Sequence, residues 1–160
     1  MKTNEAADIM SKQLITIAFD ADLTAAFTLM AKHRIRHLPV TDSTGTTVGI
    51  LSDRDMRRAM KPECENGQFD PAFRVKDFMS WPPLSVSAET PVFDVAERML
   101  RERISAYLVV SHDRQHPSGI ITTDDMLKLL LVLLANDPTR GRLSLADYMN
   151  DPAYEKSLWS

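Results

Sequence analysis

The chain has 160 residues, of which 44% are hydrophobic, and its formal net charge is −3. A chain of this length can bury a core as one compact domain or two small ones, and its slightly acidic balance argues against nucleic acid as a partner, which would need a clustered basic face. Its single cysteine, Cys64, cannot form an internal disulfide, and its N-terminus lacks the apolar core of a signal peptide. Its strongest apolar run, residues 127–134, is shorter than the roughly 20 residues that span a bilayer. We therefore expect a cytoplasmic protein that binds neither membranes nor nucleic acids.

Hydrophobic periodicity predicts the order strand, helix, strand, strand, helix in the first part of the chain, after a short lead-in helix. Apolar residues recur with helical spacing after Asp22, whose carboxylate can accept a free amide of the first turn. Two apolar runs around a polar turn at Gly45 predict a hairpin, and Ser52 is in position to cap the helix that follows. The predicted elements are the lead-in helix at 6–11, strands at 14–17, 35–40 and 48–51, and helices that begin at 23 and at 52, the second ending near 60.

A linker separates this first unit from a second unit with the same order of elements. Residues 61–74 are rich in turn formers and lack periodicity. Beyond them the predicted elements are strands at 84–86, 106–110 and 118–121, a helix at 91–102 with Pro91 in its first turn, and a helix that begins at 123. The predicted organisation is repeat 1 at 1–60 with the lead-in helix, the linker at 61–74, repeat 2 at 75–135 and a C-terminal tail at 136–160.

The two units are copies of one another, because the sequence matches itself at an offset of about 69 residues. Asp8-Ile9-Met10-Ser11 aligns with Asp77-Phe78-Met79-Ser80, and Gly49-Ile50-Leu51-Ser52 aligns with Gly119-Ile120-Ile121-Thr122 after a one-residue slip in a loop. Further pairs in this register are Leu23 with Val92, Met30 with Met99, Arg34 with Arg103, Ile35 with Ile104 and Val40 with Val109. So long a register indicates a tandem duplication.

The last predicted helix is apolar on nearly all sides, and such a helix is expected to be buried on both sides. One apolar face consists of Met126, Leu129, Leu130 and Leu133, and the other of Leu127, Leu131 and Leu134. Two interpretations stay open. The helix either makes a tighter core in repeat 2, or residues Leu127–Leu134 form the interface of a homodimer, since a solvated patch of leucines is a liability.

Each unit carries two motifs in the same order. The first is an apolar strand of the type Ile35-Arg36-His37-Leu38-Pro39-Val40, and the second is Gly-apolar-apolar-Ser/Thr-x-x-Asp, which ends at Asp55 in repeat 1 and at Asp125 in repeat 2. The chain resembles a tandem pair of CBS domains, a Bateman module, and is similar to the small stand-alone CBS proteins of the acetoin-utilisation type. The resemblance implies an α/β (α+β) fold in which two β-α-β-β-α repeats form one disc with pseudo-two-fold symmetry and two clefts.

The resemblance also implies a ligand, because CBS pairs commonly bind adenosine-containing molecules such as AMP, ADP, ATP, S-adenosylmethionine or a dinucleotide. Asp55 and Asp125 match the aspartate that takes the ribose hydroxyls, and one carboxylate can accept two such donors. The other matched positions are Ser52 and Thr122 for ribose or phosphate, Thr16, Ile17, Ser85, Val86, Ile35 and Ile104 for the adenine, and Arg36 and His37, in the strand that continues to Leu38 and Pro39, for phosphates. Arg36 and Arg54 would add charge-assisted bonds.

A purely structural explanation exists for the two aspartates. Ser52-x-x-Asp55 and Thr122-x-x-Asp125 also match the capping box, in which the acid only bonds back to the helix cap. The repeats further differ in charge, because repeat 2 has Ser105, Ala106 and Asp124 where repeat 1 has Arg36, His37 and Arg54. We therefore expect repeat 1 to bind a phosphorylated adenosine, and repeat 2 to be empty or to take a less charged ligand such as S-adenosylmethionine.

The sequence shows no Gly-x-x-x-x-Gly-Lys-Ser/Thr loop, no Gly-x-Ser-x-Gly elbow and no nucleophile–base pair, so we do not expect an enzyme. Two hypotheses remain. In the first, an adenosine nucleotide shifts the packing of the repeats and an unknown effector protein reads that shift. In the second, the chain is a structural module that dimerises through its leucine-rich helix and has degenerate clefts.

Overall fold

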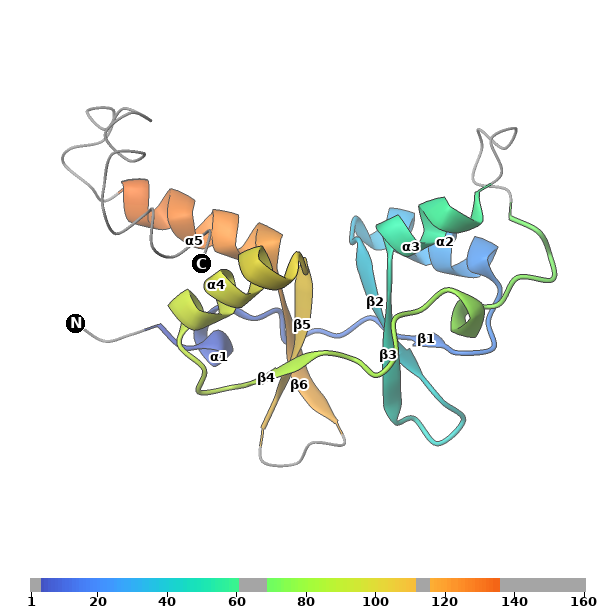
Figure 1. Cartoon of the computed structure of the whole chain (residues 1–160), viewed down its shortest axis with the longest axis horizontal. Coiled ribbons are helices and arrows are strands. Elements are labelled where there is room, and N and C mark those ends of the chain that lie inside the picture. The colour runs from blue at the N-terminus through green and yellow to red at the C-terminus, as the bar shows by residue number, and fades with distance from the viewer. Residues whose placement is uncertain (1–3, 61–68, 112–115, 136–160) are drawn as a thin grey trace.

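The computed structural model describes residues 4–60, 69–111 and 116–135. In these ranges the chain forms two units of three strands and two helices, each preceded by a short helical segment (Figure 1). The first half contains α1 (Ala6–Ile9), β1 (Ile17–Ala18), α2 (Leu23–His33), β2 (His37–Thr41), β3 (Thr47–Ser52) and α3 (Asp53–Ala59). The second half contains the 3-10 helix η1 (Val75–Asp77), β4 (Ser85–Ser87), α4 (Val92–Glu102), β5 (Ala106–Val110), β6 (Pro117–Thr122) and α5 (Thr123–Ala135).

Each unit forms a three-stranded sheet of the same topology. β1 is parallel to β2, which is antiparallel to β3, and β4, β5 and β6 repeat this arrangement. Leu38 pairs with Leu51 across the first hairpin, and Tyr107 pairs with Ile121 at the equivalent place in the second. The predicted order of strands and helices is therefore confirmed in both repeats, although β1 covers only the end of the strand predicted at 14–17.

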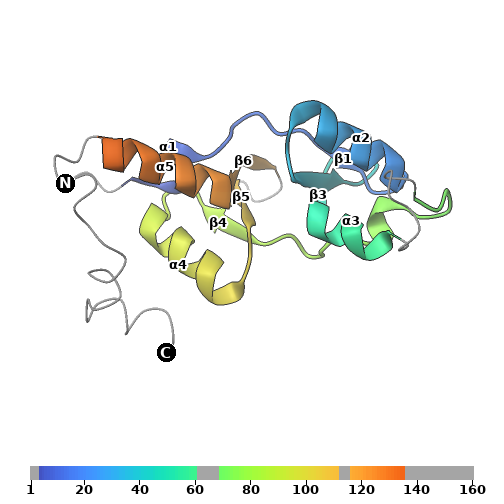
Figure 2. The same cartoon turned by 90° about the horizontal axis from the view of Figure 1, so that it is seen from above.

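Two helices cover each sheet, and local sequence signals set where they begin and end (Figures 1 and 2). The Asp22 carboxylate accepts the Ala25 amide at 2.7 Å, which confirms the predicted cap of α2. Pro91 is the N-cap residue of α4 and not, as predicted, part of its first turn. Both α2 and α4 end at an arginine in the left-handed conformation, Arg34 (φ 53°) and Arg103 (φ 56°), which turns the chain into the next strand.

Each of the short segments that precede a repeat packs on the other repeat, an arrangement that we call the exchange of lead-in segments. α1 comes before repeat 1 in the sequence, but Ala6 is buried in the core of repeat 2. The amides of Ala6 and Ala7 donate to the carbonyls of Thr90 and Ala88. η1 comes before repeat 2, but Val75 is buried in the core of repeat 1. Each lead-in segment therefore ties one repeat to the other.

Backbone hydrogen bonds fix this exchange on both sides of the molecule. Ser11 and Ile120 exchange two N–H···O bonds of 2.8 and 3.0 Å, and Ser80 and Ile50 exchange two of 2.9 and 3.1 Å. The glycine before each of these isoleucines permits the contact, because a Cβ atom there would lie 2.9 Å from the carbonyl oxygen of the docked serine. The Gly-apolar-apolar part of the motif thus serves as the docking place for a lead-in segment.

A third hydrophobic cluster lies between the two repeats. It joins Ile50 of β3, Ala106 and Leu108 of β5 and Ile120 of β6, with Leu14 packed against it. Because apolar area removed from water contributes about 25 cal/mol per Å², this shared cluster favours one fixed arrangement of the repeats.

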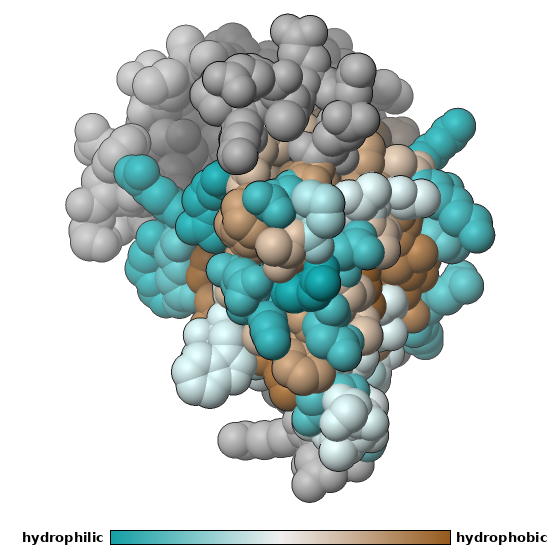
Figure 3. All heavy atoms as spheres, turned by 90° about the vertical axis from the view of Figure 1, so that its right-hand side faces the viewer, coloured by the Kyte–Doolittle hydropathy of each residue, from teal (hydrophilic) through white to brown (hydrophobic). Residues whose placement is uncertain are grey.

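α5 exposes most of its leucines. The exposed fractions are 58% for Leu127, 48% for Leu130, 66% for Leu131 and 56% for Leu133. The interpretation of a tighter core in repeat 2 is therefore wrong, since both predicted apolar faces of the helix carry exposed leucines. By contrast, the end of the molecule formed by repeat 1 interleaves hydrophilic and hydrophobic side chains (Figure 3). The predicted tail at 136–160 and residues 61–68 of the predicted linker lie outside the described residues.

Candidate functional site: two clefts between the repeats

Two clefts open between the repeats, and both repeats line each of them. We name them the Asp125 cleft, of about 380 Å³, and the Asp55 cleft, of about 450 Å³, and both volumes fall in the range of small-molecule sites. The Asp125 cleft is lined by Ser11, Gln13, Leu14, Ile15, His33, Arg34, Ile35, Arg36, His37, Pro39, Ile120, Thr122, Asp124, Asp125 and Lys128. The Asp55 cleft is lined by His37, Ile50, Ser52, Arg54, Asp55, Ser80, Trp81, Pro82, Pro83, Leu84, Arg103, Ile104, Ser105 and Ala106.

The two clefts are built from equivalent positions of opposite repeats. The beginning of α3 in repeat 1 faces residues 103–106, which lead into β5 of repeat 2. The beginning of α5 in repeat 2 faces residues 33–37, which lead into β2 of repeat 1. Each cleft therefore combines the Ser/Thr-x-x-Asp motif of one repeat with the arginine and strand residues of the other.

Asp55 is 8% exposed and lines its cleft from the first turn of α3. One carboxylate oxygen accepts the Ser52 amide at 2.9 Å and the Ser52 hydroxyl at 2.6 Å, and the other pairs with the exposed Arg58. The Ser52 oxygen in turn accepts the Asp55 amide at 3.2 Å, so the capping-box interpretation is confirmed. The box does not exclude a ligand, because a carboxylate offers about four acceptor positions and these bonds use three.

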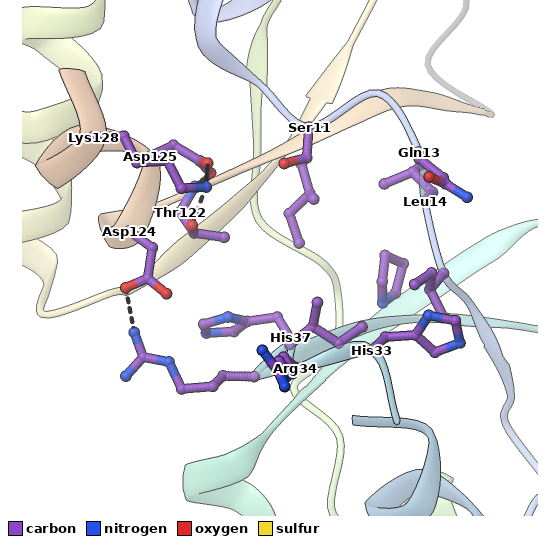
Figure 4. Close-up of a pocket in the computed structure, with 15 residues that line it drawn as sticks. Ser11, Gln13, Leu14, His33, Arg34, His37, Thr122, Asp124, Asp125 and Lys128 are labelled. Carbon is purple, nitrogen blue, oxygen red and sulfur yellow. Dashed lines mark hydrogen bonds and ion pairs between the residues drawn. The ribbon is translucent and has the colours of Figure 1, made fainter. Parts of the chain in front are cut away.

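Asp125 repeats this arrangement in the other cleft (Figure 4). One of its oxygens accepts the Thr122 amide at 2.9 Å and the Thr122 hydroxyl at 2.8 Å. The other accepts the ammonium group of Lys128 at 3.0 Å. In Figure 4 these side chains face His33, Arg34 and His37 across the opening of the cleft.

The structure separates Arg36 from Asp55, with which the sequence grouped it. Arg36 lines the Asp125 cleft and forms an ion pair with Asp124 of repeat 2. The backbone carbonyl of Arg36 accepts the Asp53 amide of α3 at 3.0 Å, but the Arg36 side chain reaches across to Asp124 at the beginning of α5. The basic side chains that line the Asp55 cleft are instead Arg54 and, from repeat 2, Arg103.

His37 lies between the clefts and lines both of them. Its Nε2 atom is 2.8 Å from the Ser105 hydroxyl of the other repeat. Burial lowers the pKa of His37 below its ordinary value of 6.5, and nearby Arg36 acts in the same direction, whereas the carboxylates of Asp53, Asp124 and Asp55 act against them. His37 is therefore kept neutral near pH 7, and its side chain meets both sites.

The predicted adenine positions are shifted along the early strands. Ile17, Val86 and Leu38 are buried in the cores of their repeats, and Thr16 and Ser85 are exposed. The cleft walls are formed by the residues just before them, Leu14 with Ile15 and Pro83 with Leu84. These residues come before β1 and β4 begin, so they lie outside the paired strands whose inward side chains form the cores. Ile35, Pro39 and Ile104 line the clefts as expected.

Several residues that line the clefts were not assigned from the sequence, and those with a cationic or large aromatic side chain are Arg34, Lys128, Arg103 and Trp81. A signal was present for two of them, because Arg34 and Arg103 coincide when the repeats are aligned. Trp81 has no such signal, since Lys12 occupies the aligned position in repeat 1. Within the described ranges, no three His, Cys, Asp or Glu side chains gather closely enough to hold a metal ion.

Two duplicated α/β units with paired clefts between them define a CBS domain pair. The chain belongs to the CBS-domain family, because the model of the CBS domain matches residues 6–62 and 75–132. A CBS domain-containing protein of Dictyostelium discoideum is 30% identical over 83% of this chain and 95% of its own length. The chain also matches a homoserine O-acetyltransferase of Methanococcoides burtonii, with 29% identity over 78% of this chain, but it spans only 24% of that enzyme.

Solved structures show the same architecture. The CBS domain pair of protein MJ0100, in complex with 5′-methylthioadenosine and S-adenosylmethionine, is 28% identical with a TM-score of 0.69, over 82% of this chain and 98% of the other. A putative acetoin utilization protein (AcuB) of Vibrio cholerae is 25% identical with a TM-score of 0.68, over 89% of this chain and 98% of the other. These likenesses confirm the fold expected from the sequence. In the described part of the chain, every helix is too short or too polar to cross a membrane.

Proposed function

We propose that this chain is a regulatory module that senses an adenosine-containing ligand, and that a phosphorylated adenosine such as AMP, ADP or ATP binds in the Asp55 cleft. The observation that carries the proposal is that the Asp55 carboxylate shares one cleft with Arg54 and Arg103. A carboxylate accepts the hydroxyl groups of a ribose, and an arginine binds phosphate oxygens through its fork of N–H donors.

The ribose would compete with Arg58 for Asp55. Arg58 pairs with one Asp55 oxygen, and its own side chain is 67% exposed. Water can solvate the released Arg58 guanidinium, and two ribose hydroxyls would replace its bond at the buried Asp55 carboxylate, so the exchange costs little. The bonds between Asp55 and Ser52 would stay, and the cap of α3 with them.

Sensing follows from the construction of the cleft. Ser52, Arg54 and Asp55 come from repeat 1, whereas Arg103 and Ile104 come from repeat 2. A ligand that contacts both repeats binds best to one relative position of them, and it shifts the population toward that position by its difference in affinity. We propose that an effector protein, whose identity is unknown, reads this shift.

For the Asp125 cleft we propose a less charged ligand, of the S-adenosylmethionine or thioether nucleoside kind. Asp124 neutralises Arg36, and Asp125 neutralises Lys128. A phosphate group that binds Arg36 or Lys128 would have to displace a carboxylate, which leaves Arg34 as the further cation of this cleft. The complex of the MJ0100 domain pair with 5′-methylthioadenosine and S-adenosylmethionine supports this class of ligand.

A second candidate function is a structural module that dimerises and leaves its clefts empty. The observation that favours it is the exposed leucine face of α5, with Leu127 and Leu131 more than half exposed. A homodimer is compatible with both candidate functions, so they are distinguished by whether a ligand binds in the clefts.

Matched variants of the two clefts test the proposal. Asp55→Asn and Asp125→Asn keep an oxygen that can accept the cap amide, but they remove the negative charge that two ribose hydroxyls need. Thermal unfolding of the wild type and both variants is measured with AMP, ADP, ATP and S-adenosylmethionine. A ligand at 100 times its dissociation constant adds about 2.7 kcal/mol, or roughly 5–10 °C for a chain of this size.

We expect a phosphorylated adenosine to raise the unfolding temperature of the wild type and of Asp125→Asn but not of Asp55→Asn. Asp124→Asn should strengthen phosphorylated ligands in the Asp125 cleft, because it releases Arg36. Loss of the response in Asp125→Asn alone would show that the nucleotide binds the Asp125 cleft, which would contradict the proposed site. No response to any of the four ligands would contradict sensing and leave the structural module.

A further inference from the structure

We infer that the indole ring of Trp81 is the stacking surface for the base of the ligand in the Asp55 cleft, an inference that rests on the proposed function. Trp81 lines this cleft together with Asp55 and Arg103, yet its side chain is 73% exposed. An exposed tryptophan presents a large flat π surface to solvent, and such a surface gains by covering an aromatic base.

The backbone holds Trp81 in place at this cleft. Its neighbour Ser80 exchanges two hydrogen bonds, of 2.9 and 3.1 Å, with Ile50 of repeat 1. Three residues after Trp81, the Leu84 carbonyl accepts the Leu108 amide of repeat 2 at 3.0 Å. Prolines 82 and 83 lie between these anchors and restrict the chain further. Trp81 therefore belongs to a short segment, residues 80–84, that is hydrogen-bonded at both ends and bridges the two repeats. We call this segment the strap.

The chemistry around Trp81 identifies the class of ligand. The carboxylate of Asp55 suits a ribose, Arg54 and Arg103 suit a phosphate, and an indole suits a planar base. A purine nucleotide carries these three groups in one molecule. Among the residues described in the Asp125 cleft there is no Phe, Tyr or Trp, so the stacking surface belongs to the Asp55 cleft.

Tryptophan emission tests the inference directly, because the chain has only two tryptophans and the other is Trp159. In the Trp159→Phe background, AMP, ATP and S-adenosylmethionine are titrated while Trp81 emission is recorded, and calorimetry measures the same affinities. We expect a saturable change in emission with the nucleotide that binds the Asp55 cleft, at the midpoint that calorimetry gives. Asp55→Asn should abolish this change, and Asp125→Asn should retain it.

Two substitutions separate stacking from mere apolar contact. Trp81→Phe keeps an aromatic face and should retain affinity within a few fold, whereas Trp81→Leu should bind the nucleotide roughly 5- to 150-fold more weakly. Equal affinity of Trp81→Leu and wild type, or constant Trp81 emission at saturation, would overturn the inference while leaving ligand sensing intact. A changed sedimentation rate of Trp81→Leu with unchanged affinity would overturn it too, by assigning the ring to a protein interface. If no ligand binds the wild type, the proposed function fails first, and the inference with it.

Discussion

The Asp55 and Asp125 side chains each cap a helix and also line a cleft. Asp55 and Asp125 both accept the amide and hydroxyl of their helix cap with one oxygen, and both keep the other oxygen at an exposed cation. The cap holds the carboxylate in place before any ligand arrives, so little side-chain entropy remains to be lost on binding. Capping and recognition are therefore compatible at these two residues.

His37 is the residue at which we expect a pH dependence of stability. Its lowered pKa means that the unfolded chain binds its proton more readily than the folded one. The stabilisation from neutral His37 is present above its unfolded pKa of about 6.5 and is lost as the pH falls toward the folded pKa. Between about pH 7.5 and pH 5, urea unfolding should show a larger loss of unfolding free energy for wild type than for His37→Gln.

The His37→Gln variant is a matched control, because glutamine can still hydrogen-bond the Ser105 hydroxyl but does not titrate. Other groups that titrate in this range contribute equally to both proteins, so the difference between the two curves isolates His37. Parallel curves would show that protonation of His37 carries no free energy between the folded and unfolded states.

At the scale of elements, the exchange of lead-in segments joins the repeats into one unit. α1 packs on repeat 2 and η1 on repeat 1, and both continue into a serine docked on a strand of the same repeat. The strap that begins at Ser80 forms part of the wall of the Asp55 cleft. A change at this docking place should therefore affect stability and the cleft together.

Gly49 provides the test of this docking. A Cβ atom there would lie 2.7 Å from the Met79 sulfur and 2.9 Å from the Ser80 carbonyl oxygen. The sulfur can move, but the carbonyl cannot without breaking the bonds to Ile50. We expect Gly49→Ala to lower the free energy of unfolding by about 1–3 kcal/mol and to accelerate hydrogen exchange at the Ser80 and Ile50 amides.

Gly45→Ala is the control for Gly49→Ala. Gly45 has a positive φ of 83° and nothing within 4 Å of an added Cβ, so its substitution strains only the hairpin turn. It should leave exchange at Ser80 and Ile50 as slow as in the wild type. Unchanged exchange in Gly49→Ala would mean that the lead-in segment does not depend on this close approach.

In the molecule as a whole, the leucine face of α5 stands out because its large apolar side chains are exposed to solvent. Leu127, Leu130, Leu131 and Leu133 are all about half exposed or more. Contiguous apolar surface of this kind marks an interaction site, and we propose that a second copy of the chain covers it. The equivalent helix of repeat 1, α3, has Arg57 where α5 has Leu127, so we place the proposed interface on repeat 2.

Leu131 provides the test of the homodimer. Leu131→Glu should convert the dimer to a monomer, because each subunit would bury an unpaired carboxylate against apolar side chains. Leu131→Met keeps the apolar surface and should stay dimeric. Sedimentation at equal protein concentrations measures both, and a monomeric wild type or an unchanged mass of Leu131→Glu would contradict the proposed interface.

The repeat, the order of the helices and strands, and the local helix caps could all be predicted from the sequence. Asp22 and Ser52 were identifiable as caps because a cap involves residues only three apart in the chain. The duplicated motifs identified the family and its two aspartates. These features depend on spacing along the chain, which the sequence states directly.

Which residues share a cleft could not be predicted from the sequence, because it depends on how the two repeats pack. The Arg36 side chain pairs with Asp124 and does not line the Asp55 cleft, where Arg103 occupies the position expected for Arg36. Trp81 enters the Asp55 cleft because its strap docks on the opposite repeat. The physical reason is that the repeats face each other and exchange their lead-in segments, so each site is assembled across an interface whose partners lie about 50 to 90 residues apart in the chain.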